Sequence, residues 1–330
     1  MKAVQIHEFG GPDALTIDEL PVPSPGEGEV LVRLELAGVN YIDVYMRNGS
    51  YSRSQTYRTP LPMTLGMEGG GTVAALGRGS KAFCVGERVA YCLARGSYAE
   101  YAVVPEAKLV RVPATIPMPV ATALMLQGAT AHYLTHSAFK LGPQHVCLVH
   151  AGAGGVGQLL IQLAKRSGAQ VFATAGTAEK AELAKARGAD AAILYRETDF
   201  REEVLRLTCG RGVDVVYDSV GRDTLAKSLR SLKPRGTCIS FGASSGQPAP
   251  VELLELAEAG SVFLTRPHLA DYMASPEEIA HRASDLFKAV AEGALSVAID
   301  RTLPLAEVRR AHELIEGRAT RGKLLLNVAT

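Results

Sequence analysis

Three glycines near the middle of the chain have the spacing of a pyrophosphate-binding turn. Gly152, Gly154 and Gly157 match the pattern G-x-G-x-x-G within the segment His150-Ala-Gly-Ala-Gly-Gly-Val-Gly157. In this pattern the glycines permit a tight turn, a close approach of the backbone to phosphate, and close packing of a helix on a strand. Phosphate would then bind at the helix N-terminus, where free N–H groups point outward. Because glycine turns also occur for packing alone, the pattern needs support from its surroundings.

Residues beyond the turn bear on which dinucleotide it would bind. NAD-selective units usually carry Asp or Glu about 20 residues after the glycines, where a carboxylate accepts hydrogen bonds from the ribose. Here the sequence is Ala173-Thr-Ala-Gly-Thr-Ala178, followed by Lys180. No acidic side chain would repel a 2′-phosphate and a cation is close by, so we expect NADPH rather than NADH. From the sequence alone, Lys180 can equally be a solvated helix residue.

This chemistry requires a strand before the turn and a helix after it, and the flanking residues supply both. An apolar run over 145–149 precedes the turn, and an amphipathic run over 156–166 follows it. Similar apolar runs, with helix-like stretches between most of them, recur at 170–175, 191–195, 213–220, 236–242 and 261–265. This alternation predicts an α/β fold with a doubly wound parallel sheet.

The first third of the chain is patterned differently. Residues 30–36 alternate apolar with mostly polar side chains, as in a strand with one wet face. Short strands are expected at 70–76, 88–91 and 98–104, which indicates a compact antiparallel β domain. A helix over 120–139 would lead from it into the middle of the chain.

The last segment of the chain is about 64 residues long. It contains two expected helices and a strand. The helices cover 276–292 and 305–316, and the strand covers 323–328. Ser275 followed by Pro276 is a typical helix start, with a hydroxyl cap and proline in the first turn. We expect this segment to complete the first domain rather than to form a third.

Composition argues against several classes of function. The 330 residues are 47% hydrophobic and 21% charged with a formal net charge of +1, which is ordinary for a soluble enzyme of two domains. Lys and Arg are scattered, so nucleic acid and anionic membranes are not expected partners. No apolar stretch reaches the roughly 20 residues of a spanning helix, and the first residues lack the apolar core of a signal peptide. We therefore expect a cytoplasmic protein.

The cysteines suit reduced thiols rather than a disulfide framework, because they are odd in number and widely spaced. They are Cys84, Cys92, Cys147, Cys209 and Cys238. No C-x-x-C pair exists, which excludes a four-cysteine zinc site. A nucleophilic role stays open for Cys84 and Cys92, although we expect each to be a buried packing residue.

Long segments outside the glycine turn are also distinctive. They are Gly38-Val-Asn-Tyr-Ile-Asp-Val-Tyr-Met-Arg-Asn-Gly49, Gly176-Thr-Ala-Glu-Lys180, Ile193-Leu-Tyr-Arg-Glu197, Val215-Val-Tyr-Asp-Ser-Val-Gly-Arg-Asp-Thr224, Ser240-Phe-Gly-Ala-Ser-Ser-Gly246, Leu264-Thr-Arg-Pro267 and Arg318-Ala-Thr-Arg-Gly322. With the turn at 150–157, they make the chain resemble, from end to end, the NADPH-dependent quinone oxidoreductase and zeta-crystallin branch of the medium-chain dehydrogenase/reductase superfamily.

The resemblance implies a fold, an assembly and a metal-free site. We expect a GroES-like β domain built from both chain ends, 1–124 with 267–330, a Rossmann NADPH-binding domain over 125–266, a cleft between them, and a homodimer. Zinc-dependent members use a cysteine in the segment matching Gly38-Val-Asn40 and a histidine in the segment matching Gly66-Met-Glu68. This chain has Asn40 and Met67 there, and Glu68 alone cannot complete a four-coordinate site, so no metal is expected.

The resemblance also assigns cofactor residues. Lys180, Tyr195 and Arg318 are expected at the 2′-phosphate, the lysine as a point charge and the phenol as a donor. Other expected cofactor residues, in glycine-rich turns or at the carboxyl ends of strands, are Gly152, Gly154, Gly155, Val156, Gly157, Gly176, Ser219, Phe241 and Gly242. Gly242 can instead serve only a turn, and Phe241 the core. Relatives often have Asn where this chain has Ala243, so one cofactor hydrogen bond is expected to be missing.

Candidate residues around the nicotinamide and the substrate follow in the same way. Asn40, Tyr45, Tyr51 and Tyr133 match polar and aromatic positions of the family, and a tyrosine offers a flat apolar surface and one donor for a quinone. Packing is an equally good explanation for Tyr45 and Tyr133. Asn40 and Tyr51 are the catalytic candidates, with Tyr51 donating to a carbonyl oxygen. Further expectations are that Gln127 and Thr130 reach the nicotinamide amide, and that Asp43 pairs with Arg47 at i,i+4.

Hydride transfer is chemistry of the cofactor, so the protein mainly orients two reactants and excludes water. The leading interpretation is an NADPH:quinone oxidoreductase that acts on small quinones without metal or flavin. Its nearest rival is an NADPH-dependent reductase of enones or alkenals. A third interpretation is a non-catalytic NADPH-binding protein of the crystallin kind, some of which bind RNA, although the near-neutral charge argues against RNA.

Overall fold

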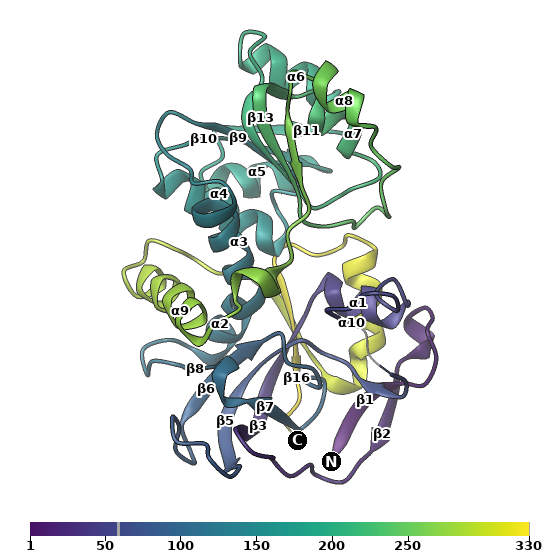
Figure 1. The fold of residues 1–330 in the computed structure, drawn as a ribbon, viewed down its shortest axis with the longest axis vertical. Helices are drawn as coiled ribbons and strands as arrows, with labels where there is room; N and C mark the ends of the chain where they lie inside the picture. The colour runs from purple at the N-terminus through teal and green to yellow at the C-terminus, as the bar shows by residue number, and fades with distance from the viewer. Residues whose placement is uncertain (58–59, 330) are drawn as a thin grey trace. The chain divides into compact units, whose positions relative to one another are not determined.

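The computed structural model describes residues 1–57 and 60–329. Its contacts divide the chain into two compact units, Met1–Ala129 with Met273–Thr330, and Thr130–Tyr272. Figure 1 shows the elements of both units along the chain. The sequence placed the two boundaries after residues 124 and 266.

Six strands form one sheet in the second unit, in the order β11-β10-β9-β12-β13-β14, and every neighbouring pair is parallel. The strands are β9 (Val146–Val149), β10 (Gln170–Ala175), β11 (Ala191–Leu194), β12 (Val213–Asp218), β13 (Leu232–Ser240) and β14 (Phe263–Thr265). The predicted doubly wound parallel sheet is therefore confirmed. The strand order reverses between β9 and β12, which is the point where open α/β sheets bind ligands.

Helices cover both faces of this sheet (Figure 1). They are α4 (Gly155–Arg166), α5 (Ala178–Ala186), α6 (Phe200–Leu207), α7 (Leu225–Leu229) and α8 (Leu253–Glu258). Phe200 and Val204 of α6 and Leu229 of α7 pack with Leu148 and Val216 in one hydrophobic core. Because both faces are covered, β12 is buried at every residue, as its continuous apolar sequence predicted.

The first unit is built on a seven-stranded sheet in the order β15-β16-β3-β5-β6-β8, with β7 also paired with β3. The strands are β3 (Glu29–Val39), β5 (Glu68–Leu76), β6 (Arg88–Cys92), β7 (Tyr101–Pro105), β8 (Leu109–Arg111), β15 (Ile299–Pro304) and β16 (Lys323–Asn327). A smaller antiparallel sheet has the order β2-β1-β4, with β1 (Lys2–Ile6), β2 (Thr16–Glu19) and β4 (Met63–Thr64).

Both ends of the chain contribute to the larger sheet, because β16 pairs antiparallel with β3. The pair β15–β16 is parallel, whereas the other pairs of this sheet are antiparallel. The tail therefore completes the first unit, as predicted. The predicted antiparallel arrangement is confirmed except for β15.

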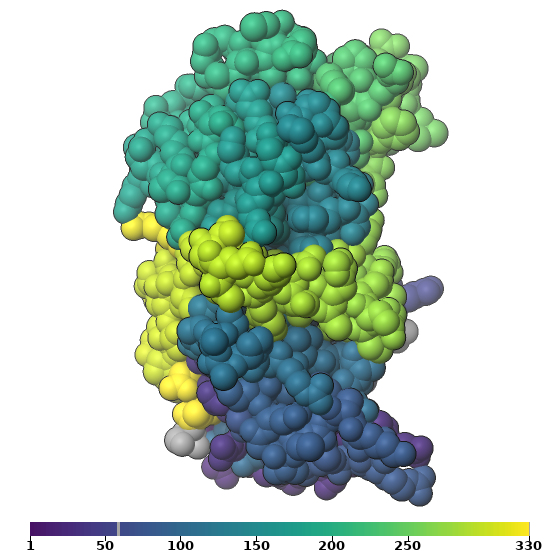
Figure 2. Space-filling view, turned by 90° about the vertical axis from the view of Figure 1, so that its left-hand side faces the viewer, coloured from purple at the N-terminus to yellow at the C-terminus, as the bar shows by residue number. Residues whose placement is uncertain are grey.

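Helices of the first unit include α1 (Tyr41–Arg47), α9 (Pro276–Ala291) and α10 (Val308–Glu316). The Ser275 hydroxyl accepts a hydrogen bond from Glu278 N, which confirms the predicted cap of α9. Leu286 and Phe287 are on the buried side of α9, and Arg282 of this helix is buried as well. The opposite side of α9 lies at the surface of the first unit (Figure 2). Short 3₁₀ turns are η1 (Pro12–Ala14), η2 (Glu106–Lys108), η5 (Leu269–Tyr272) and η6 (Leu305–Glu307).

The segment predicted as one helix over 120–139 is interrupted by wider turns. It consists of α2 (Met118–Ala123), a π-helical turn η3 (Leu124–Gly128), α3 (Ala129–Tyr133) and a second π-helical turn η4 (Leu134–Ala138). Such turns are frequent at functional sites. In the ranges 1–57 and 60–329, no helix has the length and apolar character needed to cross a bilayer.

Candidate cofactor and substrate sites

The glycine turn joins the end of β9 to the start of α4, where the sequence predicted it. Gly152 and Gly157 are buried, and a Cβ on Gly157 would lie 2.3 Å from Ala151 O. A Cβ on Gly152 would lie 2.7 Å from the Cβ of Ala173 in β10. Packing of helix on strand therefore requires glycine at both positions.

Three of the four residues between these two glycines are partly exposed. Gly154 is the N-cap of α4, and Gly154, Gly155 and Val156 are half-buried. The first N–H groups of a helix have no partner within the helix, and its dipole favours an anion there. α4 is 12 residues long and ends in Lys165 and Arg166. Its free N–H groups and its dipole make its N-terminus suitable for the pyrophosphate of a dinucleotide.

A second group of predicted residues meets at the carboxyl end of β10. A Cβ on Gly176 would lie 2.8 Å from Tyr195 Oη, so the tyrosine ring lies directly against this glycine. Tyr195 follows β11 and is 39% exposed. Thr177 caps α5 by accepting from Lys180 N at 3.3 Å, so Lys180 lies in the first turn of that helix. No acidic side chain occurs in residues 173–178.

The carboxyl ends of β12 and β13 are tied together. Phe241 N and Gly242 N donate to Asp218 O at 2.9 and 3.3 Å, and Ser244 N donates to Ser219 O at 3.1 Å. A Cβ on Gly242 would lie 2.6 Å from Ser219 O, so packing alone explains that glycine. Ser219 and Phe241 are half-buried, which leaves part of each accessible at this edge of the sheet.

Residues expected at the nicotinamide lie on the interrupted helix. Gln127 belongs to the first π-helical turn, Thr130 and Tyr133 belong to α3, and all three are buried. The Tyr133 ring stacks on Tyr272, with ring centroids 4.4 Å apart and an angle of 15° between the planes. A packing role for Tyr133 thus has direct structural support.

Asn40 faces a buried ion pair. Lys323 Nζ donates to Glu68 Oε2 and, at 2.7 Å, to Asn40 Oδ1. Asn40 Nδ2 donates to Glu68 Oε2 at 2.9 Å and to Gly38 O at 3.3 Å. Lys323 and Glu68 are both fully buried, and a Cβ on Gly38 would lie 1.8 Å from Glu68 Oε2. Gly38 therefore makes room for the charged pair.

The pair Asp43–Arg47 that the sequence suggested does not form. Asp43 Oδ2 accepts from Asn40 N at 2.8 Å and from Tyr98 Oη at 3.1 Å. Arg47 donates instead to Gly10 O, His312 and Glu316. The i,i+4 rule describes exposed helix faces, whereas Asp43 and Arg47 are buried and take partners from distant parts of the chain.

Tyrosine rings form a continuous row beside α1. The ring centroids of Tyr45 and Tyr51 are 5.3 Å apart, and those of Tyr51 and Tyr57 are 5.1 Å apart. Tyr41 continues the row at 6.0 Å from Tyr45. Tyr45 and Tyr51 are half-buried, so the row has an accessible surface. Flat aromatic surfaces of this kind suit a planar acceptor.

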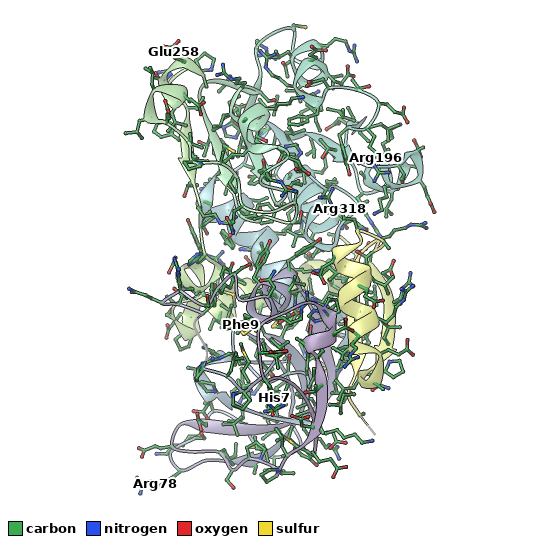
Figure 3. All side chains as sticks on the ribbon, turned by 90° about the vertical axis from the view of Figure 1, so that its right-hand side faces the viewer. His7, Phe9, Arg78, Arg196, Glu258 and Arg318 are labelled. Carbon is green, nitrogen blue, oxygen red and sulfur yellow. The ribbon has the colours of Figure 1, made fainter. Side chains whose placement is uncertain are left out.

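Arg318 lies two residues after the end of α10 (Figure 3). It has a left-handed backbone with φ of 55°. Its charge lies near Tyr41, whose pKa is raised by burial, with the arginine opposing that rise. Tyr41 Oη donates to Ile315 O at 2.9 Å, which fixes the ring against the end of α10. The Arg318 charge therefore lies close to the end of α10.

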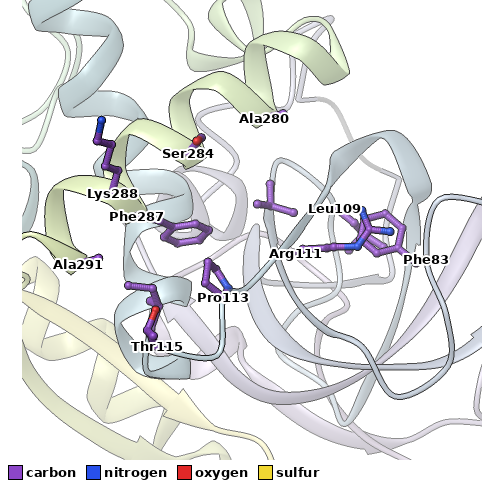
Figure 4. A pocket seen from close by; sticks show the side chains of 12 residues that line it. Phe83, Leu109, Arg111, Pro113, Thr115, Ala280, Ser284, Phe287, Lys288 and Ala291 are labelled. Atoms are coloured by element: carbon purple, nitrogen blue, oxygen red, sulfur yellow. The ribbon is translucent and has the colours of Figure 1, made fainter.

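A groove of about 520 Å³ lies elsewhere in the first unit, between α9 and the segment that includes β8. Figure 4 shows Phe287 and Pro113 on its walls, with Arg111 over the ring of Phe83 at 4.7 Å. None of the cofactor or substrate residues expected from the sequence lines this groove.

One cysteine differs from expectation. All five are free thiols, but Cys84 and Cys209 are exposed while Cys92, Cys147 and Cys238 are buried. The prediction of a buried Cys84 is therefore wrong. Burial raises the pKa of the Cys92 thiol, and the nearby Glu68 carboxylate adds to that rise, so Cys92 is poorly suited to act as a thiolate nucleophile.

Family models match both units. The model of the alcohol dehydrogenase GroES-like domain matches residues 26–114, and the model of the zinc-binding dehydrogenases matches residues 155–287. Quinone oxidoreductase 1 of Escherichia coli K12 is 40% identical over 98% of both chains. The chain belongs to the quinone oxidoreductase branch of the medium-chain dehydrogenase/reductase superfamily.

Other members of this branch are equally similar. The 2-haloacrylate reductase of a Burkholderia species is 42% identical over 98% of both chains. The solved structure of the Escherichia coli quinone oxidoreductase complexed with NADPH has a TM-score of 0.95 and 39% identity, covering 99% of this chain and 100% of the other. These likenesses confirm the predicted combination of Rossmann and GroES-like folds.

The name of one family model includes zinc, and the residues of this chain do not fit that metal. At the segments where zinc-dependent members have cysteine and histidine stand Asn40 and Met67. Glu68 is already paired with the Lys323 ammonium, whose charge would repel a cation. Across residues 1–57 and 60–329, no three His, Cys, Asp or Glu side chains are grouped so as to hold a metal ion.

Proposed function

We propose that this protein is an NADPH-dependent quinone reductase, which transfers hydride from NADPH to small quinones without metal or flavin. The observation that carries the proposal is the joint occurrence of the glycine turn at α4 and the group Gly176, Lys180 and Tyr195 at the end of β10. Relatives named quinone oxidoreductase, about 40% identical over the whole chain, support the acceptor class.

The cofactor would be held mainly by backbone and by a few side chains. Gly152 and Gly157 shape the turn. The N–H groups of Gly155 and Val156 would face the pyrophosphate, and Gly154, whose own N–H donates to Ala151 O, would lie against it through its backbone. Lys180 and Tyr195 would bind the 2′-phosphate, as a charge and as a hydroxyl donor. Arg318 is a further cation for the same group. Further proposed cofactor contacts, at strand ends and on the interrupted helix, are Gly176, Ser219, Phe241, Gly242, Gln127, Thr130 and Asn40.

Bound NADPH would supply the hydride. The chain contributes orientation, exclusion of water and one hydroxyl donor. We assign the role of hydroxyl donor to Tyr51. The amide group of Asn40 is already hydrogen-bonded to Glu68, Gly38 and Lys323. Asn40 would then act by shaping the wall beside α1. Tyr45 and Tyr133 would contribute aromatic surface to the substrate.

NADPH oxidation at 340 nm by metal-free protein tests the proposal. Offered separately, 1,4-benzoquinone and 9,10-phenanthrenequinone are expected to be reduced faster than a simple enone, and NADPH to be used in preference to NADH. The relative named 2-haloacrylate reductase makes the activated alkene the informative competitor. A dominant enone rate would replace quinone reduction by alkene reduction. Binding of NADPH without turnover of any acceptor would contradict catalysis altogether.

We also propose a homodimer formed at the β14 edge of the second unit. β14 ends the sheet order, and its Phe263 is 62% exposed. Leu253 and Leu254 of α8 are exposed as well. An apolar edge strand of this kind pairs readily with another strand, and two-fold symmetry lets two copies use the same edge. Phe263→Lys is expected to give monomers in light scattering, whereas Val85→Lys, also at an exposed residue, should leave the dimer intact. A monomeric parent chain would contradict the assignment.

The proposed location is the cytoplasm. Five free cysteines support it, because reducing compartments keep thiols unpaired.

A further inference from the structure

A chain of buried hydrogen bonds lies beneath the glycine turn of the second unit. His150, the residue that follows β9, has Nδ1 3.0 Å from Thr174 Oγ1 and Nε2 3.0 Å from Ser228 Oγ. Ser228 Oγ donates to Asp218 Oδ2 at 2.8 Å. At the other end, Ala151 N donates to Thr174 Oγ1 at 3.2 Å. The chain therefore joins β9, β10, β12 and α7 to the backbone of the turn.

The direction of each bond follows from its ends. Asp218 accepts from Val220 N, Gly221 N and the hydroxyls of Thr224 and Ser228, as a carboxylate must. Since the Ser228 hydrogen points at Asp218, its oxygen accepts from His150 Nε2–H. His150 Nδ1 then carries no hydrogen and accepts from the Thr174 hydroxyl. The Thr174 oxygen, in turn, is left to accept from Ala151 N.

The surroundings of His150 favour this neutral form. The ring is buried, and burial lowers the pKa of His150, with the Asp218 carboxylate opposing that effect. Phe200 of α6 packs edge-on against the ring at 4.7 Å. Among the described residues that contact the ring or lie one hydrogen bond further along, Asp218 is the charged one, and it lies beyond the Ser228 hydroxyl.

The bond at the far end of the chain acts on a special backbone position. Ala151 has φ of 53°, in the left-handed region that residues other than glycine rarely adopt. Its carbonyl accepts from Gly154 N at 2.9 Å and lies where a Cβ on Gly157 would clash. Gly152 N donates to Thr174 O at 3.0 Å, so Thr174 holds two successive residues of the turn. A change at Thr174 or His150 would therefore alter where the N–H groups of α4 point.

We propose that His150 and Thr174 are positioning residues for the cofactor, which hold Ala151 in its left-handed conformation so that the turn fits a pyrophosphate. This inference rests on the proposed function. Neither side chain needs to touch the cofactor, because their effect passes through the backbone of the turn. The expected signature is a loss of cofactor affinity with little change in the rate of turnover.

The test compares two substitutions at one residue. Thr174→Val keeps the branched shape but removes the hydroxyl, whereas Thr174→Ser keeps the hydroxyl. NADPH affinity is measured by the fluorescence of the reduced nicotinamide, and kcat and KM are measured with 1,4-benzoquinone. Thr174→Val is expected to raise the Kd and KM for NADPH about tenfold, with kcat and the quinone KM within about twofold of the parent. Thr174→Ser is expected to restore the Kd to within about twofold.

A control and a second variant keep the outcome decisive. Thr237→Val makes the same change in β13 of the same sheet, outside this chain of bonds, and should leave the Kd unchanged. If Thr174→Val does not fold, as judged by thermal melting, Ser228→Ala is used instead. This variant removes the acceptor of His150 Nε2–H and should weaken NADPH binding several-fold. An unchanged Kd in a folded Thr174→Val or Ser228→Ala protein overturns the inference alone. A parent chain that does not bind NADPH overturns the proposed function, and the inference with it.

Discussion

Each unit of the molecule contains a buried histidine in a chain of hydrogen bonds that ends on an aspartate, and the two chains are satisfied differently. In the second unit four donors converge on Asp218, and both of its oxygens are used. In the first unit Arg47 donates to His312 Nδ1, His312 lies 3.3 Å from Tyr98 Oη, and Tyr98 donates to Asp43. Asp43 Oδ1 has no hydrogen-bond partner among the described residues.

The difference shows how the same residue types can be stable in one place and sensitive to pH in another. Burial raises the pKa of Asp43 to about 7, although Asn40 N and Lys323 oppose the shift. Burial also lowers the pKa of His312 to about 3, and the Arg47 charge adds to that effect. The interior of the first unit thus contains charged and titratable side chains. The second unit holds its glycine turn with hydroxyl and backbone groups.

The largest expected effect on the contrast between the two units comes from removing one charge from the interior of the first unit. Lys323→Met leaves Glu68 buried without a counter-charge and should lower the free energy of unfolding by about 3–5 kcal/mol, measured by urea denaturation. In the second unit Lys233 pairs with Asp214 near the surface, so Lys233→Met should cost less than about 1 kcal/mol. Adding Glu68→Gln to Lys323→Met should recover much of the loss. Equal costs for the two lysines would contradict the contrast between the units.

The second test uses pH to separate the two ends of the first unit's chain. His312 has a folded pKa below its unfolded value, so its contribution to stability is present above about 6.5 and is lost as pH falls toward 3. Asp43 has a folded pKa above its unfolded value, so its contribution is present below about 3.8 and is lost as pH rises through 7. Between pH 7 and 5 each trend amounts to about 2 kcal/mol, in opposite directions.

Substitution should make each trend visible in urea denaturation across that range. Asp43→Asn should lose stability on acidification relative to the parent, because only the His312 trend remains. His312→Gln should gain stability on acidification, because only the Asp43 trend remains. An exposed histidine, His281 of α9, supplies the control variant His281→Gln. Parallel pH profiles for the parent, Asp43→Asn and His312→Gln would show that neither residue titrates as described.

A third test asks whether the second unit acts through binding. Lys180→Ala should raise the KM for NADPH about tenfold, because a charge-assisted contact to phosphate is lost. The KM for NADH should not change, since NADH has no 2′-phosphate. Lys185→Ala on the same helix is the control, because Lys185 pairs with Glu182 on the exposed side. A similar rise for both cofactors would remove Lys180 from phosphate recognition.

The smallest expected effect concerns turnover in the first unit. Tyr51→Phe should lower kcat by more than about threefold, a barrier increase of roughly 0.7 kcal/mol or more, with NADPH affinity unchanged. Tyr57→Phe removes a hydroxyl from the neighbouring ring, 5.1 Å away, and should leave kcat unaffected. Steady-state kinetics with saturating NADPH measures both. A Tyr51→Phe enzyme with the parent's kcat would exclude the hydroxyl from the reaction.

Local patterns in the sequence were sufficient for most of the fold. The glycine turn was predictable because its signal is a spacing of small residues between an apolar run and an amphipathic run. The cap at Ser275 was predictable because all of its groups lie within three residues. The interruptions at Leu124–Gly128 and Leu134–Ala138 were not, because a π-helical turn leaves the apolar pattern of a helix almost unchanged.

The buried hydrogen-bond chains could not be predicted from the sequence. His150 meets a partner 78 positions away, and Arg47 meets one 265 positions away. The sequence suggested Asp43 as the partner of Arg47 because a helical spacing was the nearest available rule. Once both side chains were buried, contacts from other elements replaced that local pair. Lys323 was missed for the same reason, since it lies 255 positions from Glu68.

The place of β16 in its sheet has a consequence for how the chain is made. The ribosome releases residues 130–272, the whole second unit, before Lys323 has been synthesised. Until then β3 lacks its β16 neighbour and Glu68 lacks its counter-ion. A nascent chain of that length therefore contains every residue of the second unit but an incomplete sheet in the first. Synthesis of β16 then supplies both the missing strand neighbour of β3 and the counter-ion of Glu68.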